Sequence, residues 1–115
     1  MAVRNTTRKT LIAETLLNFN PHFNKTLQHL NRSGIPSGCA LWINPCQSIF
    51  TVGLTNPVDI IFLDNRGKVL KVLRNFPPNC FALAARDSVS ALELPSRTVE
   101  STGTEKGDIL DLDPT

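Results

Sequence analysis

The sequence predicts a mainly β domain, with α+β at the margin: a jelly-roll-like β-sandwich or small barrel with one or two short N-terminal helices. Three observations predict it. Short runs rich in Val, Ile, Leu and Phe recur along the chain, turn-forming Gly, Pro and Asn separate these runs, and no apolar periodicity sustains a long helix. The 115 residues suit one domain, so we expect a single folded unit over 1–115, with its core over about 10–112 and frayed termini.

The N-terminal third contains the predicted helix. Thr10–Ala13 is expected to be a short strand, and Pro21 interrupts any long helix after it. Lys25–Leu30 is predicted to be a short helix capped by Asn24, because an asparagine side chain can accept a hydrogen bond from a backbone N–H of the first turn.

The rest of the chain is predicted to consist of strands and turns. Each strand is a run of β-favouring residues bounded by turn-forming residues. The predicted strands are Cys39–Ile43, Ser48–Val52, Val58–Leu63, Lys68–Leu73, Val89–Leu94 and Ile109–Leu112. The predicted core includes Leu41, Ile43, Ile49, Ile60, Phe62, Val72 and Leu92.

The strongest local signal is a hairpin. Val58–Leu63 and Lys68–Leu73 flank the polar turn Asp64–Gly67, in which Gly67 supplies the positive φ that such turns require. Because both runs are nearly continuous in apolar residues, both strands are expected inside a sheet rather than at a free edge. The turn should be the exposed tip.

Charge and hydropathy exclude several classes of partner. The net charge is only +2, and no aromatic residue is interleaved with the one basic cluster, Arg4, Arg8 and Lys9, so nucleic acid is not expected. No apolar run reaches the about 18 residues that span a membrane. The N-terminus also lacks a clear signal-peptide pattern. We therefore expect a monomer without a membrane span, in the cytoplasm by default.

The cysteines indicate thiols rather than a metal site. Cys39, Cys46 and Cys80 are widely spaced, and three cysteines cannot all pair within one chain. We expect three reduced, half-buried side chains, and a disulfide between two of them stays the alternative, which requires an oxidising compartment. Zinc needs about four clustered nitrogen or sulfur ligands, so neither a metal nor a cofactor is expected.

Several stretches resemble a known bacterial and archaeal family. They are Ala13–Thr15, Ala40–Ile43, Pro45–Thr51, Pro57–Asp64, Gly67–Leu70, Ala91–Pro95 and Gly107–Asp108. The family is the uncharacterised domain of unknown function 192, and the resemblance runs from about Leu11 to Leu112. It implies a compact, mostly β, jelly-roll-like domain with short N-terminal helices, and it implies no function. Phe50 and Val52–Leu54 stand where members usually carry a histidine or a methionine–lysine pattern, which weakens the idea of a family-wide catalytic group there.

Two carboxylates inside apolar strands are the first candidate site. Asp59 lies within Val58–Leu63, and Glu93 lies within the strand that ends at Leu94. A buried carboxylate is unfavourable unless it is paired or hydrogen-bonded. Each carboxylate either accepts backbone N–H groups or pairs with an arginine, or else the two share one pocket and shift each other's pKa. The sequence leaves both interpretations open.

The second candidate is the only tryptophan, Trp42. It either packs in the core or forms the floor of a concave site beside the hydroxyls of Ser48 and Thr51. No complete catalytic or phosphate-binding motif accompanies it. The candidate ligand-binding residues are therefore Trp42, Ser48, Thr51, Asp59 and Glu93, and no catalytic residue is assigned.

These features favour a non-catalytic binding or accessory module that recognises a small polar ligand or a partner protein. One alternative is a hydrolase or lyase that uses Asp59 and Glu93 as an acid–base pair. Another is an assembly component of a larger cell-envelope or secretion machine, which an exposed strand edge would join.

Overall fold

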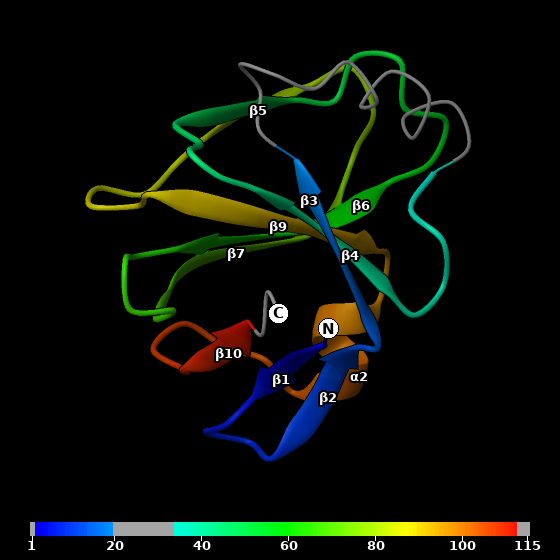
Figure 1. Cartoon of the computed structure of the whole chain (residues 1–115). Helices are drawn as coiled ribbons and strands as arrows, with labels where there is room; N and C mark the ends of the chain where they lie inside the picture. Colours follow the sequence, from blue (N-terminus) through cyan, green and yellow to red (C-terminus); the bar gives the residue numbers. More distant parts are fainter. Residues whose placement is uncertain (1, 20–33, 113–115) are drawn as a thin grey trace.

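The computed structural model describes residues 2–19 and 34–112, which form three layers of β-structure (Figure 1). The strands are β1 Val3–Asn5, β2 Thr10–Ala13, β3 Thr15–Phe19, β4 Cys39–Ile43, β5 Ser48–Phe50, β6 Val58–Leu63, β7 Val69–Phe76, β8 Phe81–Leu83, β9 Ser90–Pro95 and β10 Leu110–Leu112. The short helix α2, Thr98–Thr102, follows β9.

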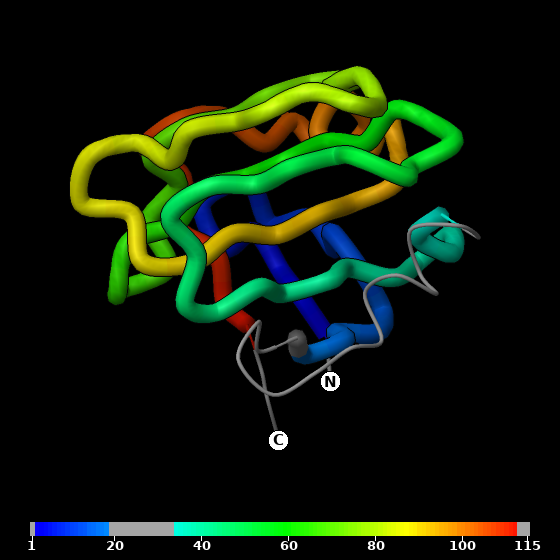
Figure 2. The backbone as a smooth tube through the Cα atoms, turned by 90° about the horizontal axis from the view of Figure 1, so that it is seen from above, coloured from blue at the N-terminus to red at the C-terminus, as the bar shows by residue number. Residues whose placement is uncertain are grey.

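A five-stranded sheet forms the middle layer. Its order is β3-β4-β9-β6-β7, with β3 parallel to β4 and the other neighbours antiparallel. The two-stranded sheet β5-β8 covers one face, and the sheet β10-β1-β2 together with α2 covers the other (Figures 1 and 2). The middle sheet is therefore shielded on both faces.

Each face of the middle sheet has its own hydrophobic core. The first core, on the side of β10-β1-β2, contains Val3, Ile12, Ala13, Leu16, Ala40, Ile61, Leu63, Val69, Leu92, Leu94, Val99 and Leu110. The second core, on the side of β5-β8, contains Leu41, Ile43, Cys46, Ile49, Leu54, Val58, Ile60, Phe62, Ala82 and Ala91. Because successive side chains of a strand point to opposite faces, β6 contributes to both cores and is buried along its whole length.

The mainly β class is confirmed, together with much of the strand assignment. Thr10–Ala13, Cys39–Ile43 and Val58–Leu63 have the predicted bounds, and the other predicted strands are present with shifted ends. β1, β3, β8 and α2 were not predicted. The small barrel is wrong, because none of the three sheets in the described part of the chain closes on itself. The helix predicted at residues 24–30 lies outside the described residues.

The hairpin is confirmed, but one expectation about it is wrong. β6 lies between β9 and β7, whereas β7 is the last strand of the five-stranded sheet. The apolar residues of β7 pack against the two cores above and below it, and only Val69 at its start has a lateral neighbour, through backbone hydrogen bonds with Gly107 and Asp108. Of the seven predicted core residues, only Val72 is not fully buried, and it lies on this edge strand.

The tip of the hairpin is fastened to β10. Gly67 has the predicted positive φ, at 82°. Its carbonyl accepts a hydrogen bond from Leu110 N at 2.8 Å, and a Cβ at this position would collide with the Leu110 carbonyl oxygen. The glycine is thus required for its backbone conformation and for the close approach of β10.

Candidate functional site

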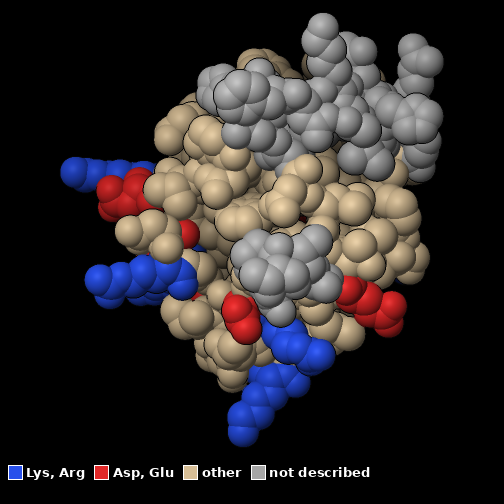
Figure 3. Space-filling view, in the orientation of Figure 1, with Lys and Arg blue, Asp and Glu red and all other residues tan. Residues whose placement is uncertain are grey.

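A cup of about 420 Å³ opens between the hairpin tip and β10. Its lining residues are Trp42, Asn44, Leu63, Asp64, Asn65, Arg66, Gly67, Val89, Ser90, Leu110, Asp111 and Leu112. The hairpin tip and β10 face each other at the left of Figure 1, and Figure 3 shows side chains of both charges on the same side of the molecule. This is the concavity from which a candidate site is built.

Strand alternation decides which side chains face the interior of the cup. Trp42 of β4 and Ser90 of β9 lie on the face of the middle sheet that carries the first core. Leu110 belongs to the first core, and Leu112 packs against it. Asp111, between these two leucines, has an exposed side chain on the opposite face of β10. The inner wall is therefore aromatic and aliphatic apart from the Ser90 hydroxyl.

Trp42 is the distinctive residue of this wall. Its side chain is half-buried and packs against the first core. The indole Nε1 is buried, yet it has no hydrogen-bond acceptor among the described residues. A buried donor without an acceptor costs roughly 1–3 kcal/mol, and any acceptor that reached it would recover that cost. Trp42 thus carries both an apolar surface and an unused polar group.

The rim of the cup carries one negative and one positive side chain, both on the β6–β7 turn. Asp64 Oδ1 accepts hydrogen bonds from Lys68 N at 2.9 Å and from Arg66 N at 2.8 Å. These hydrogen bonds, that from Lys68 first, lower the pKa of Asp64, so the carboxylate is ionised at neutral pH. Asp64 Oδ2 has no hydrogen-bond partner within the described ranges, and Arg66 is exposed and forms no ion pair with them.

Two predicted site residues lie on the other side of the middle sheet. Ser48 is half-buried on β5 and pairs in register with Leu83. Thr51 is fully buried, and its hydroxyl accepts a hydrogen bond from Cys80 N at 2.9 Å and lies 2.7 Å from the carbonyl oxygen of Pro77. Thr51 therefore fastens the connection between β5 and β8. The structure does not bring Ser48 or Thr51 to Trp42.

Asp59 and Glu93 are buried but separated. Asp59 accepts hydrogen bonds from Asn75 N at 2.9 Å and from Val99 N at 2.8 Å, on the side of the first core. Glu93 pairs in register with Ile60, which belongs to the second core. Burial raises the pKa of Glu93 to about 7. The structure does not assemble these carboxylates into one pocket, because the sheet lies between them.

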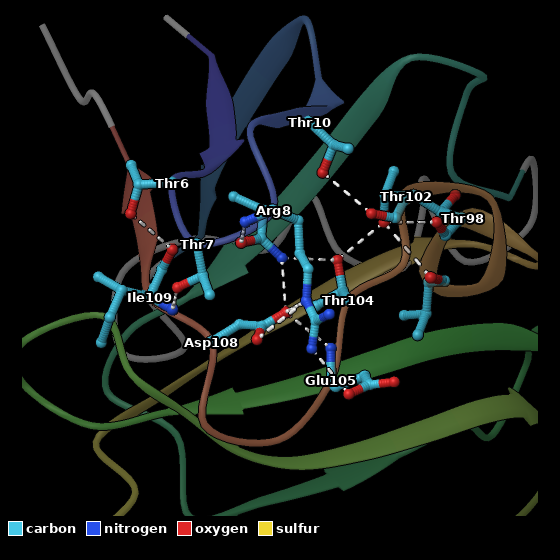
Figure 4. Close-up of polar contacts among 12 residues, drawn as sticks. Thr6, Thr7, Arg8, Thr10, Thr98, Thr102, Thr104, Glu105, Asp108 and Ile109 are labelled. Atoms are coloured by element: carbon cyan, nitrogen blue, oxygen red, sulfur yellow. Dashed lines mark hydrogen bonds and ion pairs between the residues drawn. The ribbon is translucent and has the colours of Figure 1, made fainter.

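A third polar cluster joins the two ends of the described chain (Figure 4). Asp108 Oδ2 accepts hydrogen bonds from Arg8 Nε at 3.0 Å, Asn5 Nδ2 at 2.9 Å and Glu105 N at 3.0 Å. Arg8 also forms an ion pair of 2.7 Å with Glu105. Burial alone raises the pKa of the Asp108 carboxyl, but the hydrogen bonds from Arg8 and Asn5 outweigh it, and the pKa lies below its ordinary value. We call this cluster the Asp108 clasp. Its charged groups are paired with one another, so its role is structural: it joins the segment after β1 to the segment before β10.

The thiols and the remaining groups add no reactive centre to the cup. Cys39, Cys46 and Cys80 are free thiols. Burial raises the pKa of the Cys46 thiol to about 11, so it is protonated at neutral pH and a poor nucleophile. Within residues 2–19 and 34–112, no group of three or more His, Cys, Asp or Glu side chains could hold a metal ion. No helix in those ranges has the length and hydropathy to cross a membrane.

Sequence reasoning found part of the cup and missed the rest. Trp42 was a candidate, and the turn Asp64–Gly67 was predicted to be the exposed polar tip of the hairpin but was not among the candidate site residues. Ser90, Leu110 and Asn44 were missed, since their approach to Trp42 depends on tertiary structure. The only feature of the sequence that could have indicated these residues of the cup was the polar turn directly after a buried strand.

Comparisons with known proteins place the fold. Residues 24–112 match the family described as Uncharacterized ACR, a domain of unknown function. A protein of unknown function from Novosphingobium aromaticivorans is similar over 96% of this chain and 82% of its own, with a TM-score of 0.72 and 17% identity. A putative transcription regulator from Sinorhizobium meliloti is similar over 96% and 89%, with a TM-score of 0.69 and 15% identity. No curated protein matches the chain. At these identities the likeness concerns the fold alone.

Proposed function

Since the chain belongs to the domain of unknown function family 192, which supplies no activity, we propose from its geometry that it is a non-catalytic module that binds a small polar ligand in the cup beside Trp42. The observation that carries this proposal is a concavity of about 420 Å³ that Trp42 and leucine side chains line and that carries polar side chains on its rim. Concave, mostly apolar sites with a few polar groups are the usual form of small-ligand sites.

The placement of the acidic residues supports binding over catalysis. A hydrolase or lyase that used Asp59 with Glu93 would need both carboxyls at one substrate. The middle sheet separates them, and both carboxylate oxygens of Asp59 are occupied by backbone N–H groups. Cys46 is buried and protonated at neutral pH.

We also propose a jelly-roll topology and a cytoplasmic location. The jelly-roll sandwich is supported by the antiparallel run β4-β9-β6-β7 and by the packing of a second sheet on each face. An experimental structure of the whole chain tests this topology. The cytoplasm is supported by the three free thiols, which suit a reducing compartment. Fractionation of the native host tests the compartment.

The chain is well suited to a direct test of ligand binding. Trp42 is the only tryptophan and there is no tyrosine, so near-ultraviolet-excited emission reports on the cup alone. We expect at least one pool from a library of small polar metabolites to change this emission saturably. Calorimetry with the resolved ligand should show that Trp42→Ala weakens binding about ten- to hundredfold. Arg74→Gln, an exposed change outside the cup, should leave binding unchanged.

The binding proposal fails if no pool changes the emission and calorimetry detects no ligand. It also fails if a ligand binds Trp42→Ala as tightly as the unchanged protein, because the site then lies elsewhere.

An assembly component is the second candidate, and one specific observation favours it. The outer face of β5-β8 exposes Phe50 at 63% and Phe81 at 48%, with ring centroids 4.6 Å apart, and it also exposes Val52 and Leu83. Contiguous exposed apolar side chains are typical of protein interfaces. If a partner uses this face, the double change Phe50→Ser with Phe81→Ser should abolish a complex recovered from native extract, whereas Leu11→Ser, at another exposed apolar position, should retain it. Equal recovery with both variants would contradict this candidate.

A further inference from the structure

The cup has an amphiphilic lining, which restricts its ligand more than its volume does. Its inner wall is mostly apolar: Trp42 and Leu112 are half-buried, Leu63 and Leu110 are buried behind them, and Ser90 adds one hydroxyl group. Its rim is polar and carries Asn44, Asp64, Asn65 and Arg66. A matching ligand has an apolar body and a polar end. A sugar, with hydroxyl groups around its whole ring, would leave several of them against leucine side chains without partners.

The two charges of the rim lie close together along the chain. Asp64 and Arg66 are two residues apart on one tight turn, and the Asp64 carboxylate holds the backbone N–H of Arg66 at 2.8 Å. Neither side chain forms an ion pair with another described residue. A ligand whose positive and negative groups are also close together, separated by one carbon atom, therefore fits this rim better than a ligand of single charge.

The volume indicates a ligand of modest size. About 420 Å³ lies near the lower end of the range of about 300–1,000 Å³ that is typical of small-molecule sites. This space is large enough for an amino acid with a large side chain.

On the basis of the proposed function, we infer that the cup binds a free α-amino acid with a large apolar side chain. The ammonium group contacts Asp64 Oδ2, the carboxylate contacts the Arg66 guanidinium, and the side chain packs on Trp42 and Leu110. Binding forms and breaks no covalent bond. The Trp42 wall supplies apolar area, and the rim supplies selectivity for the zwitterion.

Four probes separate the contributions of the two charges. L-Leucine carries both, 4-methylpentanoate lacks the ammonium group, 3-methylbutylamine lacks the carboxylate, and methyl glucoside is a neutral polyol. We expect L-leucine to change the Trp42 emission saturably, each half-ligand to bind about ten- to hundredfold more weakly, and methyl glucoside to show no saturable effect. Calorimetry confirms each affinity independently of fluorescence.

Charge-neutral variants assign each contact. Asp64→Asn keeps the oxygen that accepts from Arg66 N and Lys68 N, so the turn should persist. It should weaken the binding of L-leucine but not the binding of 4-methylpentanoate. Arg66→Gln should weaken the binding of L-leucine but not the binding of 3-methylbutylamine. Asp87→Asn and Arg74→Gln remove exposed charges outside the cup and should leave the affinity for L-leucine and for both half-ligands unchanged.

The outcomes separate this inference from the proposal on which it rests. If a half-ligand binds as tightly as L-leucine, or if Asp64→Asn weakens L-leucine and 4-methylpentanoate equally, the zwitterion assignment is wrong. If only methyl glucoside or another library compound binds, and Trp42→Ala abolishes it, the amino-acid assignment is wrong while the binding module stands. If no compound binds, both are wrong.

Discussion

Asp59 of β6 and Glu93 of β9 lie on neighbouring antiparallel strands, and their side chains project from opposite faces of the middle sheet. The register pairs Asp59 with Leu94 of the first core and Glu93 with Ile60 of the second. A pair of carboxylates that looks catalytic in the sequence therefore has two separate structural settings. One is hydrogen-bonded to backbone, and the other is a buried acid whose pKa is raised.

Asp59→Ala should destabilise the fold strongly. The change leaves the N–H groups of Val99 and Asn75 without their acceptor, and Val99 is fully buried. Lost hydrogen bonds to a charged group predict a free energy of unfolding lower by about 2–5 kcal/mol. Urea denaturation measures this change. Asp111→Ala, at an exposed position of β10, should stay within about 0.5 kcal/mol of the unchanged protein, and an equal effect of both variants would contradict the role of Asp59.

Glu93 should make stability fall as the pH rises towards neutrality. Burial raises its folded-state pKa from 4.5 to about 7, so the folded state binds the proton more tightly than the unfolded state does. The contribution is complete below about pH 4.5, declines as the pH rises and is lost above about pH 7. Its size is on the order of 3 kcal/mol. Urea denaturation between pH 5 and 8 should show this slope, and Glu93→Gln should flatten it; an unchanged slope in the variant would assign the effect to another group.

Asp108→Asn should weaken the Asp108 clasp and destabilise the fold by an amount that depends on pH. The folded-state pKa of Asp108 lies below its ordinary value of 3.8, so its stabilising contribution is present above that pH and is lost as the pH falls through the folded-state pKa. We expect a lower melting temperature than that of the unchanged protein at pH 7 and a smaller difference near pH 3. Asp111→Asn, on the exposed face of β10, is the matched control and should leave the melting temperature unchanged at pH 7.

Gly67→Ala should be more destabilising than Gly53→Ala. Both glycines have positive φ, at 82° and 90°, so each alanine carries a similar backbone penalty of about 1–2 kcal/mol. Only at Gly67 does a Cβ meet backbone, at the Leu110 carbonyl, whereas Gly53 has open space around it. Denaturant midpoints compare the two variants. Equal losses would mean that β10 moves away from the turn without a further cost.

The parts of the fold that were predicted correctly are those set by local chemistry. Val58–Leu63 is apolar apart from Asp59 and is followed by a polar turn that contains Gly67, so its bounds and the hairpin follow from nearby residues. β1 and β8 have only three residues each. Such segments become strands because partners distant in the sequence supply their hydrogen bonds, which no local pattern reveals.

The candidate site shows the same division. Trp42 was predicted either to pack in the core or to form the floor of a concave site, and it does line the cup. Ser48 and Thr51 are near it in the sequence, but the chain crosses to the other layer before reaching them. The approach of Ser90 and Leu110 to Trp42 depends on how the strands and layers pack. Distance along the chain was therefore a poor guide to distance in space.

The pairing of β1 with β10 has a consequence for how the protein is made. Val3 lies opposite Leu112, and the Asp108 clasp joins Arg8 to a residue 100 positions later. β1 must therefore wait for β10 to leave the ribosome, and until then Val3 and Ile12 have no completed core to enter. Closing so long a loop is slow relative to local pairing. The layer that holds one wall of the cup is consequently completed only after β10 has left the ribosome, so a chain that stalls before β10 would display an unfinished first core to the quality-control machinery.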